Sequence, residues 1–355
     1  IPAGVTSLGS AVFYNCKALK SPLVIPNGIT EIGADTFNNC LLVPSITVPD
    51  SVTVIGEEAF RYCQSITSIN IPKGVTSIGI RAFSYCTSLT SVTIPEGITV
   101  IDTGLFYGCT KLETVTLPQS LTNISNGAFN KCSSLTGITI PGKVTKIDVY
   151  AFNDCDSLKS VVVPDSVTTL GRYAFYSCDT LESITLSKNI KTIEQDTFHN
   201  CKALKSIVIP DGVTSIGKQA FSWCTSLTTI TIPDSVQSFG DSAFCYCELL
   251  EAVKIPYGIT TIEDSTFESC ESLTSIEIPK TVTSIGVNAF RDCSALETVS
   301  VPGSVKTIEW GAFYDCDALV SITFNEGVET IGDSVLRDCG KLAYVSFPST
   351  LSSLG

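Results

Sequence analysis

The sequence predicts a repeat solenoid, a stack of β-rungs that share one continuous core. A cysteine recurs every 23 residues from Cys40 to Cys339, a phenylalanine precedes nearly all of these cysteines by three residues, and prolines recur in one phase. Self-similarity with such a period is typical of solenoids, in which each repeat contacts only its neighbours. We therefore expect a single domain over residues 1–355, made of about fifteen 23-residue rungs. Both ends fall within a repeat, so we expect flanking repeats in a longer protein.

The first element of each rung is a strand. In the rung that begins at Ser88, the apolar residues Leu89, Val92 and Ile94 follow the pattern L-x-x-V-x-I. Alternation of this kind is typical of a strand with one buried face. Pro95 has no N–H to donate to a neighbouring strand, so we expect the strand to end at Ile94.

The second element is a short extended segment, followed by a turn. Ile98 and Ile101 are expected to point inward, and the next residue is Asp102 here and Gly in many other rungs. Such residues suit a positive φ or the N-cap of a helix. We therefore expect a short helical turn that carries Phe106 and Cys109 into the core.

The 16 cysteines form a ladder with one thiol in each rung and one extra, Cys245. A metal site needs several ligands that converge, and this spacing offers none, so we expect no metal and no cofactor. We expect the ladder to be buried and reduced; the alternative is disulfides between neighbouring rungs, which stack at about 5 Å. Cys245 lies out of phase beside Phe244, so we expect a more exposed and more reactive thiol there.

Charge and motif content narrow the function. The net charge is −13, with 35 acidic and 22 basic residues. Nucleic-acid binding needs clustered basic residues, so we expect no nucleic-acid partner. No apolar run approaches the length of about 18 residues that spans a membrane, so we expect no membrane insertion in this chain. His199 is the only histidine and no nucleophile or phosphate-loop motif is present. We therefore expect no enzyme activity and no catalytic residue.

The consensus L-x-x-I-x-I-P, V-T-x-I-G and A-F-x-x-C resembles the BspA-like, Treponema-type leucine-rich repeats over the whole chain. Commoner leucine-rich repeats carry an Asn or Cys ladder after the strand, where this chain has Gly97, Ser120 and similar residues. The resemblance implies a right-handed, curved solenoid. A parallel sheet would form the concave face, with short strands and short helical turns on the convex face. It also implies a cell-surface or secreted, virulence-associated protein that acts in cell adhesion.

The outward rows of the concave face are the candidate partner-binding surface. Ser and Thr dominate these rows, which suits either a hydroxyl-rich binding platform or an ordinary solvated strand. Lys254 and Glu277 break the pattern on adjacent rungs, where a plain cross-strand ion pair is the favoured interpretation over ligand contact. The candidate contact residues are Ser91, Thr93, Thr114, Thr116, Lys254, Glu277 and Tyr344.

Aromatic residues also lie beside the cysteines of neighbouring rungs, at Tyr62 with Tyr85 and at Trp223 with Tyr246. We expect partial burial between the rungs; the alternative is a contact patch on the convex side.

The leading functional hypothesis is an adhesion repeat that holds a host matrix or cell-surface protein, or a glycan, on its concave face. The alternatives are a passive structural spacer or surface-array element, and an intracellular scaffold. A cell-surface or secreted location follows from the resemblance. The free-thiol ladder suits a reducing compartment, so a cytoplasmic location stays open.

Overall fold

A computed structural model describes residues 1–355, which form a parallel β-solenoid without any helix. The chain divides into two compact units, Ile1–Leu181 and Glu182–Gly355, each of which is described by itself. The 23-residue phase of the sequence continues through the boundary. The organisation as one domain stays a prediction.

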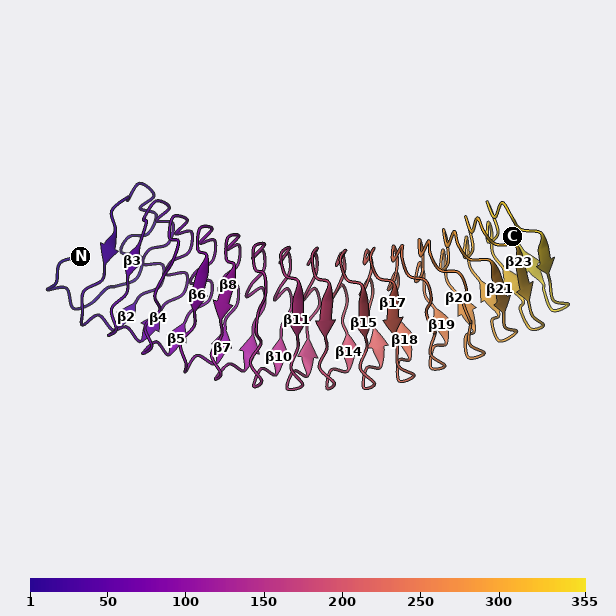
Figure 1. The fold of residues 1–355 in the computed structure, drawn as a ribbon, viewed down its shortest axis with the longest axis horizontal. Helices are drawn as coiled ribbons and strands as arrows, with labels where there is room; N and C mark the ends of the chain where they lie inside the picture. Colours follow the sequence, from indigo (N-terminus) through magenta and orange to yellow (C-terminus); the bar gives the residue numbers. More distant parts are fainter. The chain divides into compact units, whose positions relative to one another are not determined.

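Within each unit, the first strands of successive rungs lie side by side (Figure 1). They pair in parallel, one repeat apart, as in the register Ser206↔Thr229 and Val208↔Thr231. The residue between the two outward residues is buried in most of these strands, as at Ile207, which explains the alternation in the sequence. In the first unit these strands are β1 (Leu23–Val24), β3 (Ile46–Thr47), β6 (Ser91–Thr93), β8 (Thr114–Thr116) and β11 (Ser160–Val162). In the second unit they are β13 (Ser183–Thr185), β15 (Ser206–Val208), β17 (Thr229–Thr231), β21 (Thr298–Val301), β23 (Ser321–Phe324) and β25 (Tyr344–Ser346).

The second strands are two residues long and also pair in parallel, as in Ile193↔Ile216. Each except the last, in which Leu354 is exposed, places one apolar residue in the core. In the first unit they are β2 (Glu31–Ile32), β4 (Val54–Ile55), β5 (Ser77–Ile78), β7 (Val100–Ile101), β9 (Asn123–Ile124), β10 (Lys146–Ile147) and β12 (Thr169–Leu170). In the second unit they are β14 (Thr192–Ile193), β16 (Ser215–Ile216), β18 (Ser238–Phe239), β19 (Thr261–Ile262), β20 (Ser284–Ile285), β22 (Thr307–Ile308), β24 (Thr330–Ile331) and β26 (Ser353–Leu354).

The expected helical turn after the second strand is wrong. Consecutive β-turns occupy this segment, and two residues of each rung have positive φ, such as Asp35 at 57° and Asn39 at 64°. Alternate amides donate to the next rung, as Phe37 N–H does to the Ala59 carbonyl at 2.8 Å. Because these amides bond between rungs, they are not available for the i→i−4 bonds of a helix. We call this segment the turn ladder.

The core is a continuous stack of phenylalanine rings inside each unit. The Phe60 and Phe83 rings lie 5.3 Å apart and are nearly parallel. The cysteine of each rung packs beside this stack, and the Cys63 thiol donates to the Phe37 carbonyl at 3.2 Å. The same carbonyl also accepts from the Cys40 amide at 3.1 Å, so the thiol adds a second bond, one that joins neighbouring rungs.

The cysteines are free thiols, and all but Cys16 and Cys339 are buried. The expected exposure of Cys245 is wrong, because only 6% of this residue is accessible. It lies within the turn ladder, where its sulfur is 4.0 Å from the Glu268 carboxylate of the next rung. Burial, assisted by that carboxylate, raises the pKa of the Cys245 thiol to about 12, which disfavours the reactive thiolate.

Candidate functional site

The outward side of the first strands forms one polar surface in each unit, which we call the first-strand face. Ser91 pairs with Thr114, and Thr93 with Thr116, and all four side chains are exposed. Tyr344 belongs to the same row as Ser321 and is 72% exposed. The face thus presents the hydroxyl-rich rows that the sequence predicts.

Lys254 and Glu277 do not form the expected ion pair. The Lys254 ammonium lies 2.8 Å from the Asp234 carboxylate, on the turn of the preceding rung. This hydrogen bond is the main reason why the pKa of Lys254 is raised. Glu277 is exposed and has no ion pair. An unpaired acid on the first-strand face is therefore available to a partner.

The first-strand ladder is interrupted around these two residues. Residues 252–255 and 275–278 form no strand, and only the isolated bridges Thr229↔Ala252 and Ser275↔Thr298 remain. In some other rungs the amide that follows the strand continues the ladder, as Ile209 N–H does to the Thr231 carbonyl at 3.0 Å. No such bond is made by Ile255 or Ile278. The rungs are therefore less tightly joined here than in β15 and β17.

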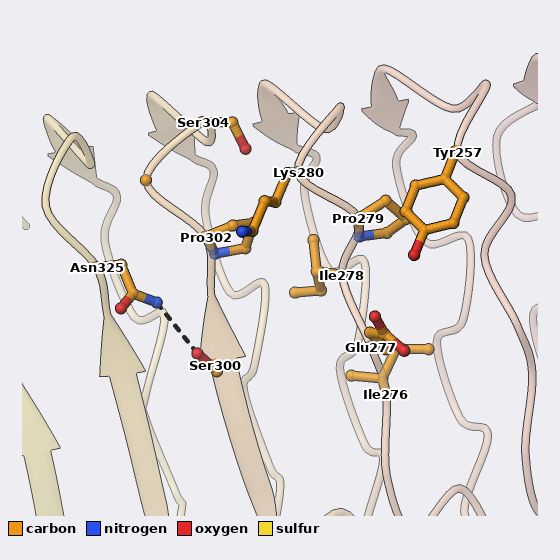
Figure 2. Close-up of a pocket in the computed structure, with 11 residues that line it drawn as sticks. Tyr257, Ile276, Glu277, Ile278, Pro279, Lys280, Ser300, Pro302, Ser304 and Asn325 are labelled. Atoms are coloured by element: carbon orange, nitrogen blue, oxygen red, sulfur yellow. Dashed lines mark hydrogen bonds between the residues drawn. The ribbon is translucent and has the colours of Figure 1, made fainter.

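A groove opens at this interruption, at the ends of the first strands (Figure 2). Its volume is about 930 Å³, and it lies wholly within the second unit. A smaller hollow of about 320 Å³ adjoins it on the Lys254 side. We call the larger of the two the Tyr257 groove and define it by Tyr257, Glu277, Ile278, Pro279, Pro302 and Ser304.

Gly303 explains why the groove opens. A Cβ at this position would overlap the carbonyl oxygen of Glu326, so the turn at Gly303 lies closer to the next rung than a side chain would permit. Asn325 reinforces this approach, because its side chain donates to the Val301 carbonyl at 2.7 Å and to the Ser300 hydroxyl at 3.1 Å. The turn at Gly303 is thereby held against the following rung, and the groove separates it from the turn at Pro279.

The hydrogen bonding of Ser304 shows the same displacement of the turn at Gly303. In other rungs, the Ser or Thr at this position donates to a carbonyl of the preceding rung, as Ser120 does to Ile98 at 2.7 Å and Thr281 to Ile259 at 2.9 Å. The hydroxyl oxygen of Ser304 is buried without a partner. The hydrogen bond that would close the groove is missing.

The groove combines an apolar floor with charged groups. Ile278 and Pro279 are buried, and Tyr257 is 60% exposed. In Figure 2 the Tyr257 hydroxyl points toward Glu277, while Lys280 extends across Pro302. Such an arrangement can hold an extended ligand by apolar contact and by charges of both signs.

Sequence reasoning identified Glu277 but missed Tyr257 and Gly303. The row after the proline contains mostly polar residues such as Asp50 and Lys280, and Tyr257 is its only aromatic residue. A comparison of this row from rung to rung would have shown the exception. The importance of Tyr257 depends on the groove, and the groove is formed by contacts between rungs.

The aromatic pairs of the turn ladder are partly buried, as the favoured interpretation predicted. The Tyr62 and Tyr85 rings stack at 4.7 Å, and those of Trp223 and Tyr246 at 4.1 Å. Trp223 remains 40% exposed. These pairs cover the turn ladder and stiffen it.

Comparison with known proteins identifies the repeat. A family model for the BspA type leucine rich repeat region matches in overlapping segments at residues 1–113, 53–182, 122–250, 168–297 and 240–355. The chain belongs to the BspA-type leucine-rich-repeat family. No curated protein matches it.

Solved structures of leucine-rich-repeat proteins agree with this fold. A leucine-rich repeat protein from Bacteroides ovatus is 31% identical over 99% of this chain and 87% of its own, with a TM-score of 0.73. A leucine rich cell surface protein from Faecalibacterium prausnitzii is 30% identical over 98% of this chain and 86% of its own, with a TM-score of 0.53. The structure contains no helix that could span a membrane.

Proposed function

We propose that this BspA-type repeat is a non-enzymatic, protein-binding domain of the bacterial cell surface or of a secreted protein, and that the first-strand face makes the contact. The observation that carries the proposal is the concentration of departures from the repeat on this face, at Lys254, Tyr257 and Glu277. A purely structural rung has no need of an exposed aromatic residue beside an unpaired acid. The similarity to a cell surface protein of Faecalibacterium prausnitzii supports the location.

The partner class we favour is a host matrix or cell-surface protein. Exposed Ser and Thr hydroxyls can exchange hydrogen bonds with a protein surface, and the rows extend over several rungs of each unit. Adhesion is the biological role that this partner class supports.

The second candidate function is a passive spacer. The uniformity of the rows around Ser91, Thr93, Thr114 and Thr116 favours it, because here the outward rows of the first strands lack the Tyr, Trp and Arg residues that usually anchor an interface.

Binding to immobilised matrix proteins separates the two candidates. The purified chain would be applied to a panel of purified matrix proteins, together with two variants that place arginines on the first-strand face. These are Thr93→Arg with Thr116→Arg, and Val208→Arg with Thr231→Arg. We expect saturable binding of the wild type and at least a fivefold loss in one variant.

The control is Val100→Arg, which lies outward on the second-strand side, at β7. It should bind as the wild type does. Absence of saturable binding by the wild type, or binding by both double variants that equals that of the wild type, would count against the first-strand face as the contact surface.

A further inference from the structure

The Tyr257 groove carries an inference about what the first-strand face recognises, and it rests on the proposed function. We propose that the groove binds an extended peptide segment of a partner protein. The peptide carries a basic residue for Glu277 and an acidic residue for Lys280, separated by apolar residues that cover Ile278 and Pro302.

The charges of the groove carry the first step. Glu277 and Lys280 both line it, both are exposed, and neither has an ion pair within the chain. The nearby Lys254 is already neutralised by Asp234 at 2.8 Å. The groove therefore offers one free charge of each sign, and a ligand with the opposite arrangement satisfies both.

The aromatic ring carries the second step. Tyr257 projects beside Glu277 and is 60% exposed (Figure 2). An ammonium or guanidinium group within about 6 Å of an aromatic ring is attracted to its face. A basic side chain placed at Glu277 gains this contact as well as the carboxylate, which favours a cation at this end of the groove.

The unpaired polar groups carry the third step. Ile255 and Ile278 lack the ladder bond that Ile94 and Ile209 make, and the hydroxyl oxygen of Ser304 has no partner. The main chain of an extended peptide offers donors and acceptors at regular spacing to such groups. Neutral oligosaccharides offer hydroxyls but no charges for Glu277 and Lys280, so these charges favour a peptide over a neutral glycan.

Selection from a random dodecapeptide library displayed on phage tests this proposal on the full chain. Parallel selections would use the wild type and the variant in which both charges are exchanged, Glu277→Lys with Lys280→Glu. We expect wild-type selection to enrich peptides with a basic and an acidic residue in one order around apolar residues. The exchanged variant should enrich the reverse order.

Affinities of one enriched synthetic peptide, measured by isothermal titration calorimetry, complete the test. We expect Tyr257→Ala and Glu277→Gln each to weaken binding about three- to tenfold. Asp50→Asn should change nothing, because Asp50 occupies the same post-proline row in the first unit. Thermal melting would show that each variant is folded.

Each other outcome overturns the inference. Enriched peptides without the charge pattern, or with the same order in both selections, would reject the charge assignment. Peptides whose affinity depends on Thr93→Arg with Thr116→Arg but not on Glu277 would reject the groove while leaving the proposed function intact. Competition by maltohexaose or chitohexaose at equal potency would identify a glycan site instead. Failure to enrich any peptide would reject the peptide-binding groove, and the matrix-protein experiment would then decide the proposed function separately.

Discussion

Inside the stack, each phenylalanine lies between two other phenylalanines, so its removal leaves a cavity beside rings that are already packed. Phe221 is fully buried, and its ring lies 5.4 Å from that of Phe198 and 5.7 Å from that of Phe244. Interiors at this packing density tolerate the loss of large side chains poorly. Leu336 shows that leucine is accepted in this row near the last rungs.

Phe221→Ala is expected to lower the free energy of unfolding by about 3–5 kcal/mol, because it removes a buried ring and leaves a cavity. Phe221→Leu, the matched control, should cost about 1 kcal/mol. Denaturant titration followed by circular dichroism measures both values. Equal losses for Ala and Leu would contradict the packing argument.

The buried thiols make stability depend on alkaline pH. Burial raises the pKa of Cys224 from 9.0 to about 12. The unfolded thiol releases its proton above about pH 9, whereas the folded thiol keeps it, so this stabilisation is complete below pH 9 and is lost as the pH rises toward 12. The slope is about 1.4 kcal/mol per pH unit for one such thiol. Urea titrations at pH 8 and pH 10 in reductant measure the free energy of unfolding. It should decrease less between the two pH values for Cys224→Ala than for the wild type. If the free energy of unfolding depended on pH identically in the two proteins, the proposed effect of the Cys224 thiol would be refuted.

At the scale of the element, in rungs with Ser or Thr in the turn after the first strand, one side chain joins this turn to the preceding rung. Ser120 donates to the Ile98 carbonyl at 2.7 Å and accepts from the Gly97 amide at 3.1 Å. Ser304 occupies the same position in its rung and makes neither bond. Ser304 thus lacks the two hydrogen bonds that Ser120 makes, and the Tyr257 groove opens where these bonds are missing.

Ser120→Ala is expected to lower the free energy of unfolding by about 1–2 kcal/mol, because two hydrogen bonds between rungs are lost. Ser304→Ala should change it by less than about 0.5 kcal/mol, since a buried hydroxyl without a partner contributes little. Thermal and denaturant unfolding of both variants provides the measurement. A larger loss for Ser304→Ala would mean that the hydroxyl is bonded in solution.

The strands were predictable from the sequence, whereas the turn ladder and the groove were not. Alternation at Leu89, Val92 and Ile94 reports which side chains are buried, and this local signal located the first strands. The residues of the turn ladder are spaced as a helical turn would be, but their amides bond to the next rung, as at Phe37. The ion pair of Lys254 was likewise not predictable, because it depends on a contact between two rungs that the sequence of one rung does not show.

At the scale of the whole molecule, stability should spread by contact between adjacent rungs. The backbone bonds outside each rung join residues that are one repeat apart, as in Thr53 N–H to the Thr30 carbonyl at 2.8 Å. Stability of such an array is approximately the sum of each rung and its nearest-neighbour contacts. A local defect therefore affects the rungs beside it most strongly.

Phe290→Ala is expected to accelerate amide hydrogen exchange most in its own rung and in the two adjacent rungs, which contain Phe267 and Phe313. Protection near Phe60, in the first unit, should stay unchanged. Native-state hydrogen exchange with mass spectrometry maps the effect. A uniform increase along the chain would instead indicate one fully cooperative transition.

The constant offset of the bonds between rungs has a consequence for how such a gene changes in length. Insertion or deletion of 23 codons keeps every ladder partner in phase, so unequal recombination between repeats yields chains that still pair correctly. A shift by one codon is tolerated only where a loop absorbs it, as between Cys16 and Cys40, whose spacing is 24 residues. Rung-specific residues such as Tyr257 and Gly303 are lost when their rung is replaced by a copy of a neighbour. The Tyr257 groove therefore persists only in chains that keep this rung.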